Sequence, residues 1–135
     1  MAGSGCHLLN QQMKTNELTS RLGRARQVAD FVSEADSVVQ DLVSSHAGLE
    51  AVTVILNFME ENPKLDFGTP GPLVHFAEGF YGSGYEKELL ASLSRKPIPH
   101  TVWMLNRVIN GTKEPSEREQ LIKGWKRIWR VENLE

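Results

Sequence analysis

The sequence predicts an all-α fold of six or seven short antiparallel helices. Apolar residues recur every three or four positions through most of the 135 residues, and glycines and prolines interrupt this pattern at intervals of helical length. No segment alternates strictly between apolar and polar residues over five positions, as a half-buried strand would. Successive short helices are typical of a HEAT-like solenoid, and an irregular helical bundle would give almost the same pattern.

The first periodic segment runs from Thr15 to His46, with Thr15 as the expected N-cap. Gly23 weakens its middle, and residues 33–36 resemble a second helix start, so one kinked helix and two short helices both remain open. Gly48 is expected to end this segment.

A second helix is expected over residues 49–61, which are apolar around most of the helical circumference. This pattern predicts the central and most buried helix of the fold. Asn62 and Pro63 end the helix, and residues 64–68 are expected to form a loop.

Residues 68–111 are predicted to form three helices separated by glycines and prolines. Thr69 is the expected N-cap of the first helix, with Pro70 and Pro72 in its first turn, where no backbone donor is needed. Glycines at 82 and 84 separate the first helix from the second, and prolines at 97 and 99 separate the second from the third. Gly111 is expected to end the third helix in the left-handed conformation.

A last helix is predicted from Pro115, with Lys and Arg gathered toward its C-terminal end. Its expected inner face consists of Leu121, Ile122, Trp125, Ile128 and Trp129. Tryptophans among cations can bind nucleic acid by stacking and charge, but tryptophans four residues apart on an apolar stripe more often belong to the core. Because the whole chain has a formal net charge of −2, no nucleic-acid partner is expected.

Length and composition favour one domain, since 135 residues can bury one core but not two. We assign residues 13–135 to this helical domain and residues 1–12 to a flexible leader or an added extension. The single cysteine, Cys6, allows no internal disulfide. No apolar run reaches the roughly 18 residues of a membrane helix, and the first residues lack the pattern of a secretory signal. A cytoplasmic protein without a membrane partner is therefore expected.

Charged residues are segregated along the chain. From residue 27 to 66, eight carboxylates face one cation, Lys64, whereas from residue 87 to 130 ten cations face four carboxylates. Acidic residues collected in one segment predict an acidic face that docks a basic partner. The alternative is that these charges are solvated helix sides, which complement positive segments of the same fold. The predicted partner-binding residues are Glu34, Asp36, Asp41, Glu50, Glu60, Glu61 and Asp66.

Residue patterns typical of catalysis or metal binding are absent from the sequence. The four histidines occupy separate segments, and HExxH, paired-cysteine, GxSxG and P-loop spacings do not occur. His75 is expected to be a core histidine, and His100 lies at a helix start, where capping explains it. Asn106 and Arg107 are interpreted as structural contacts between helices. We therefore expect no enzyme activity, no metal and no cofactor.

Residues 68–111 carry a further pattern: PGPLVH at 70–75, FY at 80–81 with GY at 84–85, and PHTVWMLNR at 99–107. In these features the segment resembles small all-helical bacterial immunity proteins, which are encoded beside polymorphic or contact-dependent toxins. The resemblance implies a stoichiometric inhibitor that binds a cognate toxin domain, often a basic nuclease, and covers its active site or blocks its substrate. It lies outside the acidic segment 27–66, so the two observations are independent.

The leading hypothesis is therefore an immunity protein that neutralises a cognate toxin domain by protein–protein binding. The alternative is a helical adaptor or regulatory scaffold, which would bind a peptide or helix in an exposed apolar groove. A third hypothesis, an enzyme or small-ligand binder, requires His75, Tyr81, Tyr85 and His100 to converge in one pocket.

Overall fold

The computed structural model describes residues 14–134, so the predictions for the leader and for Cys6 lie outside the described residues. Over the described range the chain forms seven helices and no strand, which confirms the predicted all-α class. The helices are α2 (Thr15–Ala25), α3 (Phe31–Ser44), α4 (Leu49–Glu61), α5 (Pro72–Glu78), α6 (Tyr85–Arg95), α7 (Pro99–Gly111) and α8 (Pro115–Leu134). Of these helices in residues 14–134, none combines the length and the apolar character that crossing a bilayer requires.

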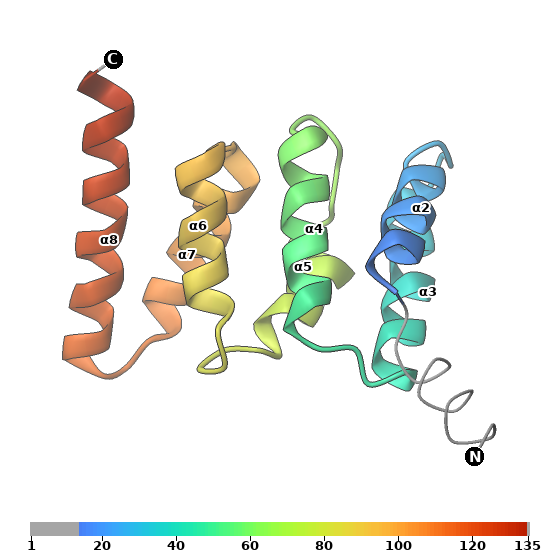
Figure 1. Cartoon of the computed structure of the whole chain (residues 1–135), viewed down its shortest axis with the longest axis horizontal. Helices are drawn as coiled ribbons and strands as arrows, with labels where there is room; N and C mark the ends of the chain where they lie inside the picture. The colour runs from blue at the N-terminus through green and yellow to red at the C-terminus, as the bar shows by residue number, and fades with distance from the viewer. Residues whose placement is uncertain (1–13, 135) are drawn as a thin grey trace.

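The helices form two rows. A front row contains α2, α4, α6 and α8 side by side, and a back row contains α3, α5 and α7 (Figure 1). Along the front row α2 packs on α4, α4 on α6 and α6 on α8, while α2, α4 and α6 each also contact the back-row helix that follows in the chain. Each helix therefore contacts mainly its neighbours, which is the stacking expected of a solenoid rather than of an irregular bundle.

Helix α4 contributes more buried residues than any other helix among the described side chains, in line with its predicted central position. It has the predicted bounds and packs against α2, α5, α6 and α7. Its buried residues are Ala51, Val52, Ile55, Leu56, Phe58, Met59 and Glu60. Phe58 also joins a cluster with Phe31 of α3 and Phe67 of the following loop, with ring centroids 5.7–6.2 Å apart.

The first periodic segment is two helices rather than one kinked helix. The break lies at residues 26–30 and not at Gly23, because the Asp30 side chain caps α3 by accepting a hydrogen bond from the Ser33 amide at 3.2 Å. At the start of α2 the N-cap is Lys14, so the prediction for Thr15 is wrong by one residue.

The end of α3 also differs from the prediction, since the helix stops at Ser44 and not at Gly48. His46 adopts a left-handed backbone with φ of 56°, which turns the chain after the helix. Gly48 instead lies at the N-cap of α4.

Helix α5 begins at Pro72, so the prediction that Thr69 caps it and that Pro70 lies in its first turn is wrong. Gly71 is the N-cap, and its φ of 88° cannot continue into a right-handed helix. A Cβ at Gly71 would lie 1.8 Å from the carbonyl oxygen of Phe67, so only glycine fits this turn. The preceding Thr69–Pro70 peptide bond is cis.

Helices α7 and α8 depart from prediction at their ends. Gly111 is the last residue of α7 and has no positive φ; the Thr112 hydroxyl instead donates to the carbonyl oxygen of Val108 at 2.6 Å. On α8, Leu121 is buried as predicted, but Trp129 is 56% exposed. The prediction of an inner position for Trp129 is therefore wrong; among the described elements, α6 and α7 make the main contacts with α8.

Candidate functional site

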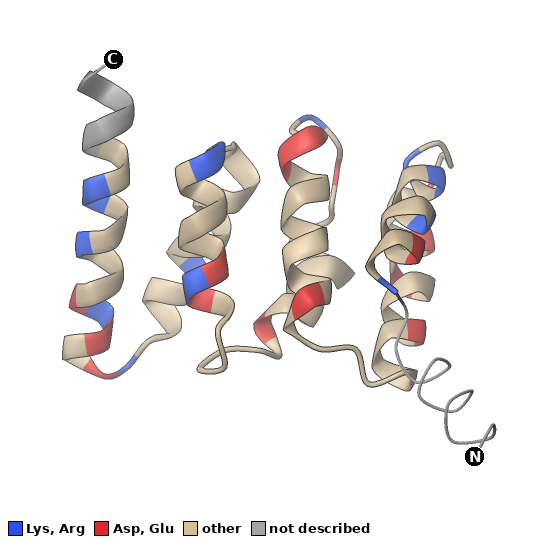
Figure 2. Cartoon of the chain, viewed as in Figure 1, with Lys and Arg blue, Asp and Glu red and all other residues tan. Residues whose placement is uncertain are grey.

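The clearest charged feature of the fold is α3 with its cap residue, which together carry Asp30, Glu34, Asp36 and Asp41 and no Lys or Arg. All four are exposed, and Figure 2 shows the acidic positions of this helix at one end of the stack. Among the described residues, only Asp41 of these four forms a salt bridge, at 2.6 Å from an Nη atom of Arg21 on α2. The carboxylate of Asp36 accepts a hydrogen bond from the Gln40 amide at 2.9 Å. Three of the seven predicted partner-binding residues therefore share α3.

Glu60 is placed differently, because it faces α6 inside the stack. The residue is 9% exposed, and its carboxylate accepts hydrogen bonds from the Ser92 hydroxyl at 2.6 Å and from Arg95 at 2.8 and 3.3 Å. The bond to Glu60 is the largest cause of the raised pKa of Arg95. The structure thus uses Glu60 as an internal contact between α4 and α6, which removes it from any acidic outer face.

The other predicted residues lie apart from one another. Glu50 is at the start of α4, where it accepts from the Gly48 amide at 3.3 Å, and Glu61 is the last residue of the same helix. Eleven residues of helical rise place them about 16 Å apart along the axis. Asp66 lies in the loop and accepts from the Gly68 amide at 2.9 Å. The seven carboxylates therefore do not form one continuous face.

Charge is nevertheless polarised along the stack. Residues 14–66, which form α2 to α4 and the next loop, contain nine carboxylates and five Lys or Arg, whereas residues 67–130 contain ten Lys or Arg and six carboxylates. Figure 2 shows the contrast between the acidic α3 and the Lys and Arg along α8 at the opposite end. Of the seven predicted residues, Glu34 and Asp36 are the two that lie together on α3 and form no ion pair with another described residue. Glu50, Glu61 and Asp66 also form no such pair, but they lie on α4 and the loop after it.

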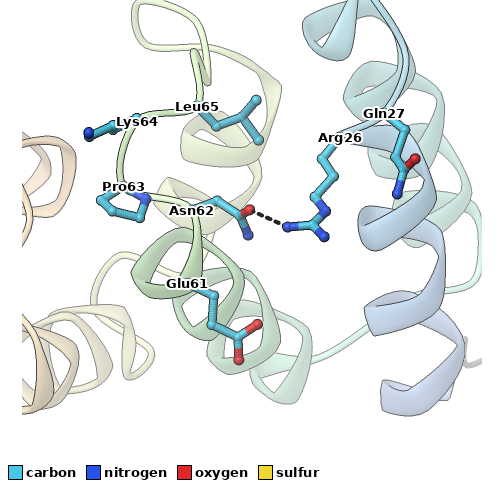
Figure 3. A pocket seen from close by; sticks show the side chains of 7 residues that line it. All are labelled: Arg26, Gln27, Glu61, Asn62, Pro63, Lys64 and Leu65. Carbon is cyan, nitrogen blue, oxygen red and sulfur yellow. Dashed lines mark hydrogen bonds between the residues drawn. The ribbon is translucent and has the colours of Figure 1, made fainter.

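A polar groove lies between α2 and α4, beside the C-terminal end of α4 (Figure 3). Arg26 donates to the side-chain oxygen of Asn62 at 2.9 Å, and the Asn62 amide donates to the carbonyl oxygen of Phe58 at 2.8 Å. The inner part has a volume of about 340 Å3 and is lined by Thr19, Gly23, Arg26, Val54, Asn57, Phe58, Glu61 and Asn62. A cation, a carboxylate and two amides at an open rim are suited to polar groups of a protein partner.

Sequence reasoning missed this groove. Asn62 was predicted only to end the helix over residues 49–61. The available signal was Gly23, which lies one turn before Arg26 on the same helix face and has no neighbouring atom within 4 Å of the place where a Cβ would lie.

His100 packs between two aromatic rings rather than acting as a cap. Its ring centroid lies 5.0 Å from that of Phe67 and 5.4 Å from that of Trp103. Burial lowers the pKa of His100, against an opposing effect of Asp66. Its Nε2 atom is buried and has no hydrogen-bond partner in the described part of the chain. The capping role belongs to Thr101, whose hydroxyl contacts the backbone N and O of Ile98.

The remaining residues of the enzyme hypothesis occupy separate environments. The side chain of His75 is 63% exposed on α5, so the prediction that His75 belongs to the core is wrong. Tyr85 is fully buried, and burial raises the pKa of its hydroxyl, with a further contribution from Glu78. Tyr81 is exposed and its hydroxyl lies 2.5 Å from that of Thr112. The Nδ1 atom of His75 lies 3.8 Å from a carboxylate oxygen of Glu78, whereas His100 packs between Phe67 and Trp103. Of the four side chains, only Tyr81 lines the pocket on α6 and α8.

The prediction that Arg107 forms a contact between helices is confirmed. Arg107 donates to both carboxylate oxygens of Glu78 on α5 at 2.8 and 3.0 Å, and its guanidinium lies 5.4 Å from the ring centroid of Trp103. The hydrogen bond to Glu78 is the largest cause of the raised pKa of Arg107. Asn106, which was also interpreted as a contact between helices, is instead exposed on α7.

Across the described residues, no three side chains from His, Cys, Asp and Glu are grouped so that they could hold a metal ion. Comparison with protein-family models, curated proteins and solved structures finds no match to this chain. The resemblance of residues 68–111 to immunity proteins therefore rests on the residue pattern alone.

Proposed function

We propose that the chain is an immunity protein, which binds a cognate bacterial toxin domain in the cytoplasm and neutralises it as a stoichiometric complex without catalysis. The observation that supports this proposal most directly is α3. Glu34 and Asp36 are exposed on a helix that carries no cation, and neither forms a salt bridge within residues 14–134. These two carboxylates are available to a basic partner, whereas Asp41 of the same helix is paired with Arg21 of α2.

The position of α3 fits a docking role. The helix lies at one end of the stack, where it packs on α2 and α5, so its acidic positions face solvent. A toxin domain that acts on nucleic acid carries a basic surface, and an acidic helix accelerates encounter with such a surface and sets its orientation. Covering that surface would exclude the substrate phosphates. Of the seven sequence-predicted residues, Glu34 and Asp36 are therefore assigned the main electrostatic role, with Asp41 beside them.

The direct test starts from the neighbouring gene, where we expect a secreted protein that ends in a toxic C-terminal domain. Co-production of the chain should restore growth of cells that express the domain, and the two proteins should elute together as a complex of fixed stoichiometry. The proposal is overturned if the domain remains toxic and no complex forms.

The role of α3 is tested by the double substitution Glu34→Lys and Asp36→Lys. We expect the association rate constant with the toxin domain to fall at least about tenfold at low salt, and the difference to shrink as salt screens the charges. The matched control is Glu117→Lys with Glu119→Lys, which makes the same change in charge at the same spacing on α8. If both double variants slow association equally, α3 is not the docking helix.

A further inference from the structure

Within residues 14–134, the back row has an open position next to α7, behind α8. Among the described helices, α2, α4 and α6 each have a back-row helix beside them, whereas α8 contacts α6 and α7 and has no back-row helix of its own. A groove of about 650 Å3 lies at this place, between α7 and α8. Its lining residues are Pro97, Ile98, Pro99, Val102, Trp103, Leu105, Asn106, Ile109 and Trp125.

The groove is mainly apolar, and its walls are held in place. Val102, Asn106 and Ile109 recur at helical spacing and form the wall on α7. Trp103 is fixed by the ring of His100 on one side and the guanidinium of Arg107, each 5.4 Å away. An apolar groove with fixed aromatic side chains has the character of the centre of a protein–protein interface.

Helix α8 extends the apolar surface beyond the groove. Ile122, Trp125 and Trp129 are three and four residues apart, so they lie on one side of the helix. Ile122 and Trp125 are half-buried, and Trp129 is 56% exposed. The apolar stripe therefore continues along α8 for two turns past Leu121, the last buried residue among those of α8 whose side chains are described.

The rim of this surface is basic. Lys96 precedes Pro97 of the groove, Arg118 lies two turns before Trp125 on the same side of α8, and Lys126 follows Trp125 directly. All three are exposed, and none forms a salt bridge with another described residue. By contrast, Glu119 is held by Lys123 at 3.4 Å, so the neighbouring carboxylate does not neutralise the rim.

We propose that the α7–α8 groove binds an amphipathic helix of a partner protein, with an apolar stripe flanked by Asp and Glu. The helix would occupy the open back-row position beside α7, where its stripe packs on Val102, Ile109 and Trp125 and its acidic flanks face Lys96, Arg118 and Lys126. Because α7 has 13 residues, a helix of similar length, about 20 Å, spans the groove. This surface is at the opposite end of the stack from α3 and does not depend on the proposed immunity function.

Two synthetic peptides of about 18 residues serve as probes, with the same leucine stripe but flanked by Glu in one and by Lys in the other. Each is titrated into the full-length chain, and binding is followed by tryptophan fluorescence and by NMR shifts of assigned backbone amides. We expect the Glu-flanked peptide to bind at least about tenfold more tightly than the Lys-flanked peptide. The shifts should concentrate in residues 97–109 and 118–129.

The substitution Asn106→Glu places a carboxylate on the groove wall at an exposed helical position, so the fold should tolerate it. It should lower the affinity for the Glu-flanked peptide at least about tenfold, because the new carboxylate repels the Glu side chains and loses solvation on binding. The matched control is Asn57→Glu, also an exposed helical asparagine but on the α2–α4 groove, which should leave the affinity unchanged. Thermal midpoints of both variants confirm folding.

Three results would overturn the proposal. One is equal binding of the two peptides, or no binding at about 1 mM, an affinity too weak to be specific. Another is a set of shifts outside the groove. The third is concentration-dependent self-association in sedimentation velocity that Asn106→Glu abolishes, because the groove would then hold a second copy of the chain.

Discussion

The variant Glu60→Gln tests whether the contact between Glu60 and Arg95 stabilises the packing of α4 on α6. A hydrogen bond to a charged group contributes about 1.5–3 kcal/mol, and breaking a fully buried ion pair costs about 3–5 kcal/mol. Here the side chain of Glu60 is 11% exposed and that of Arg95 is 45% exposed, so solvent screens part of the interaction. Gln also keeps an acceptor for Ser92. We therefore expect the free energy of unfolding to fall by about 2 kcal/mol.

Urea denaturation followed by circular dichroism measures this change directly, and the thermal midpoint should fall by about 8 °C for a domain of this size. The control is Glu61→Gln on the next residue, which is exposed and should alter stability by less than about 0.5 kcal/mol. Affinity for a toxin domain should be unchanged by Glu60→Gln, since the carboxylate already faces Ser92 and Arg95.

Two outcomes would refute this reasoning. If Glu60→Gln is as stable as Glu61→Gln, the contact with Arg95 does not stabilise the stack. If Glu60→Gln keeps its stability but weakens toxin binding, the side chain faces a partner and not α6.

Three further predictions follow from individual residues. Gly23→Ala should raise the free energy of unfolding by up to about 1 kcal/mol in urea denaturation, because α2 has open space at this position and alanine favours the helix; an unchanged midpoint would contradict this. Gly71→Ala should lower the free energy of unfolding by well over about 2 kcal/mol, since its Cβ would meet a backbone oxygen 1.8 Å away. Gly82→Ala should lower it by only about 1–2 kcal/mol, because the φ of 77° is unfavourable for alanine but the space around the Cβ is empty. Equal losses of stability in the two glycine variants would show that the effect comes from the backbone conformation alone and not from the contact with the Phe67 oxygen. Because burial lowers the pKa of His100, the unfolded chain binds the proton more tightly, so stability should fall as pH drops through the ordinary value of 6.5. His100→Phe should flatten this part of the stability–pH curve, and an unaltered slope would assign the effect to other groups.

The fold class was predictable because helical periodicity is a local property of the chain. Residues 49–61 are apolar on most sides, which requires a central position, and α4 has both the predicted bounds and that position. The ends of helices were less predictable, because they depend on contacts made elsewhere. Asp30 acts as a cap because its carboxylate accepts from the Ser33 amide at the start of α3. Gly71 has a positive φ and lies close to the backbone oxygen of Phe67 in the preceding loop.

The candidate site shows the same limit. A run of carboxylates identifies the acidic half of the chain, but it does not say which of them meet a cation after folding. Glu60 and Arg95 are 35 residues apart, and Arg21 and Asp41 are 20 apart, so only tertiary packing joins them. Periodicity placed Trp125 and Trp129 on one stripe of the last helix, yet it could not show that Trp125 is half-buried while Trp129 is exposed.

The two-row stack also determines where the molecule opens. In such an array each helix is stabilised by its immediate neighbours, so terminal units fray before central ones. Helix α4, enclosed on both sides, should exchange its amide protons with solvent most slowly, and α8 should exchange them fastest among the long helices. Both α3 and α8 belong to the outer units, so a ligand on either would slow exchange at that end while leaving the centre unchanged.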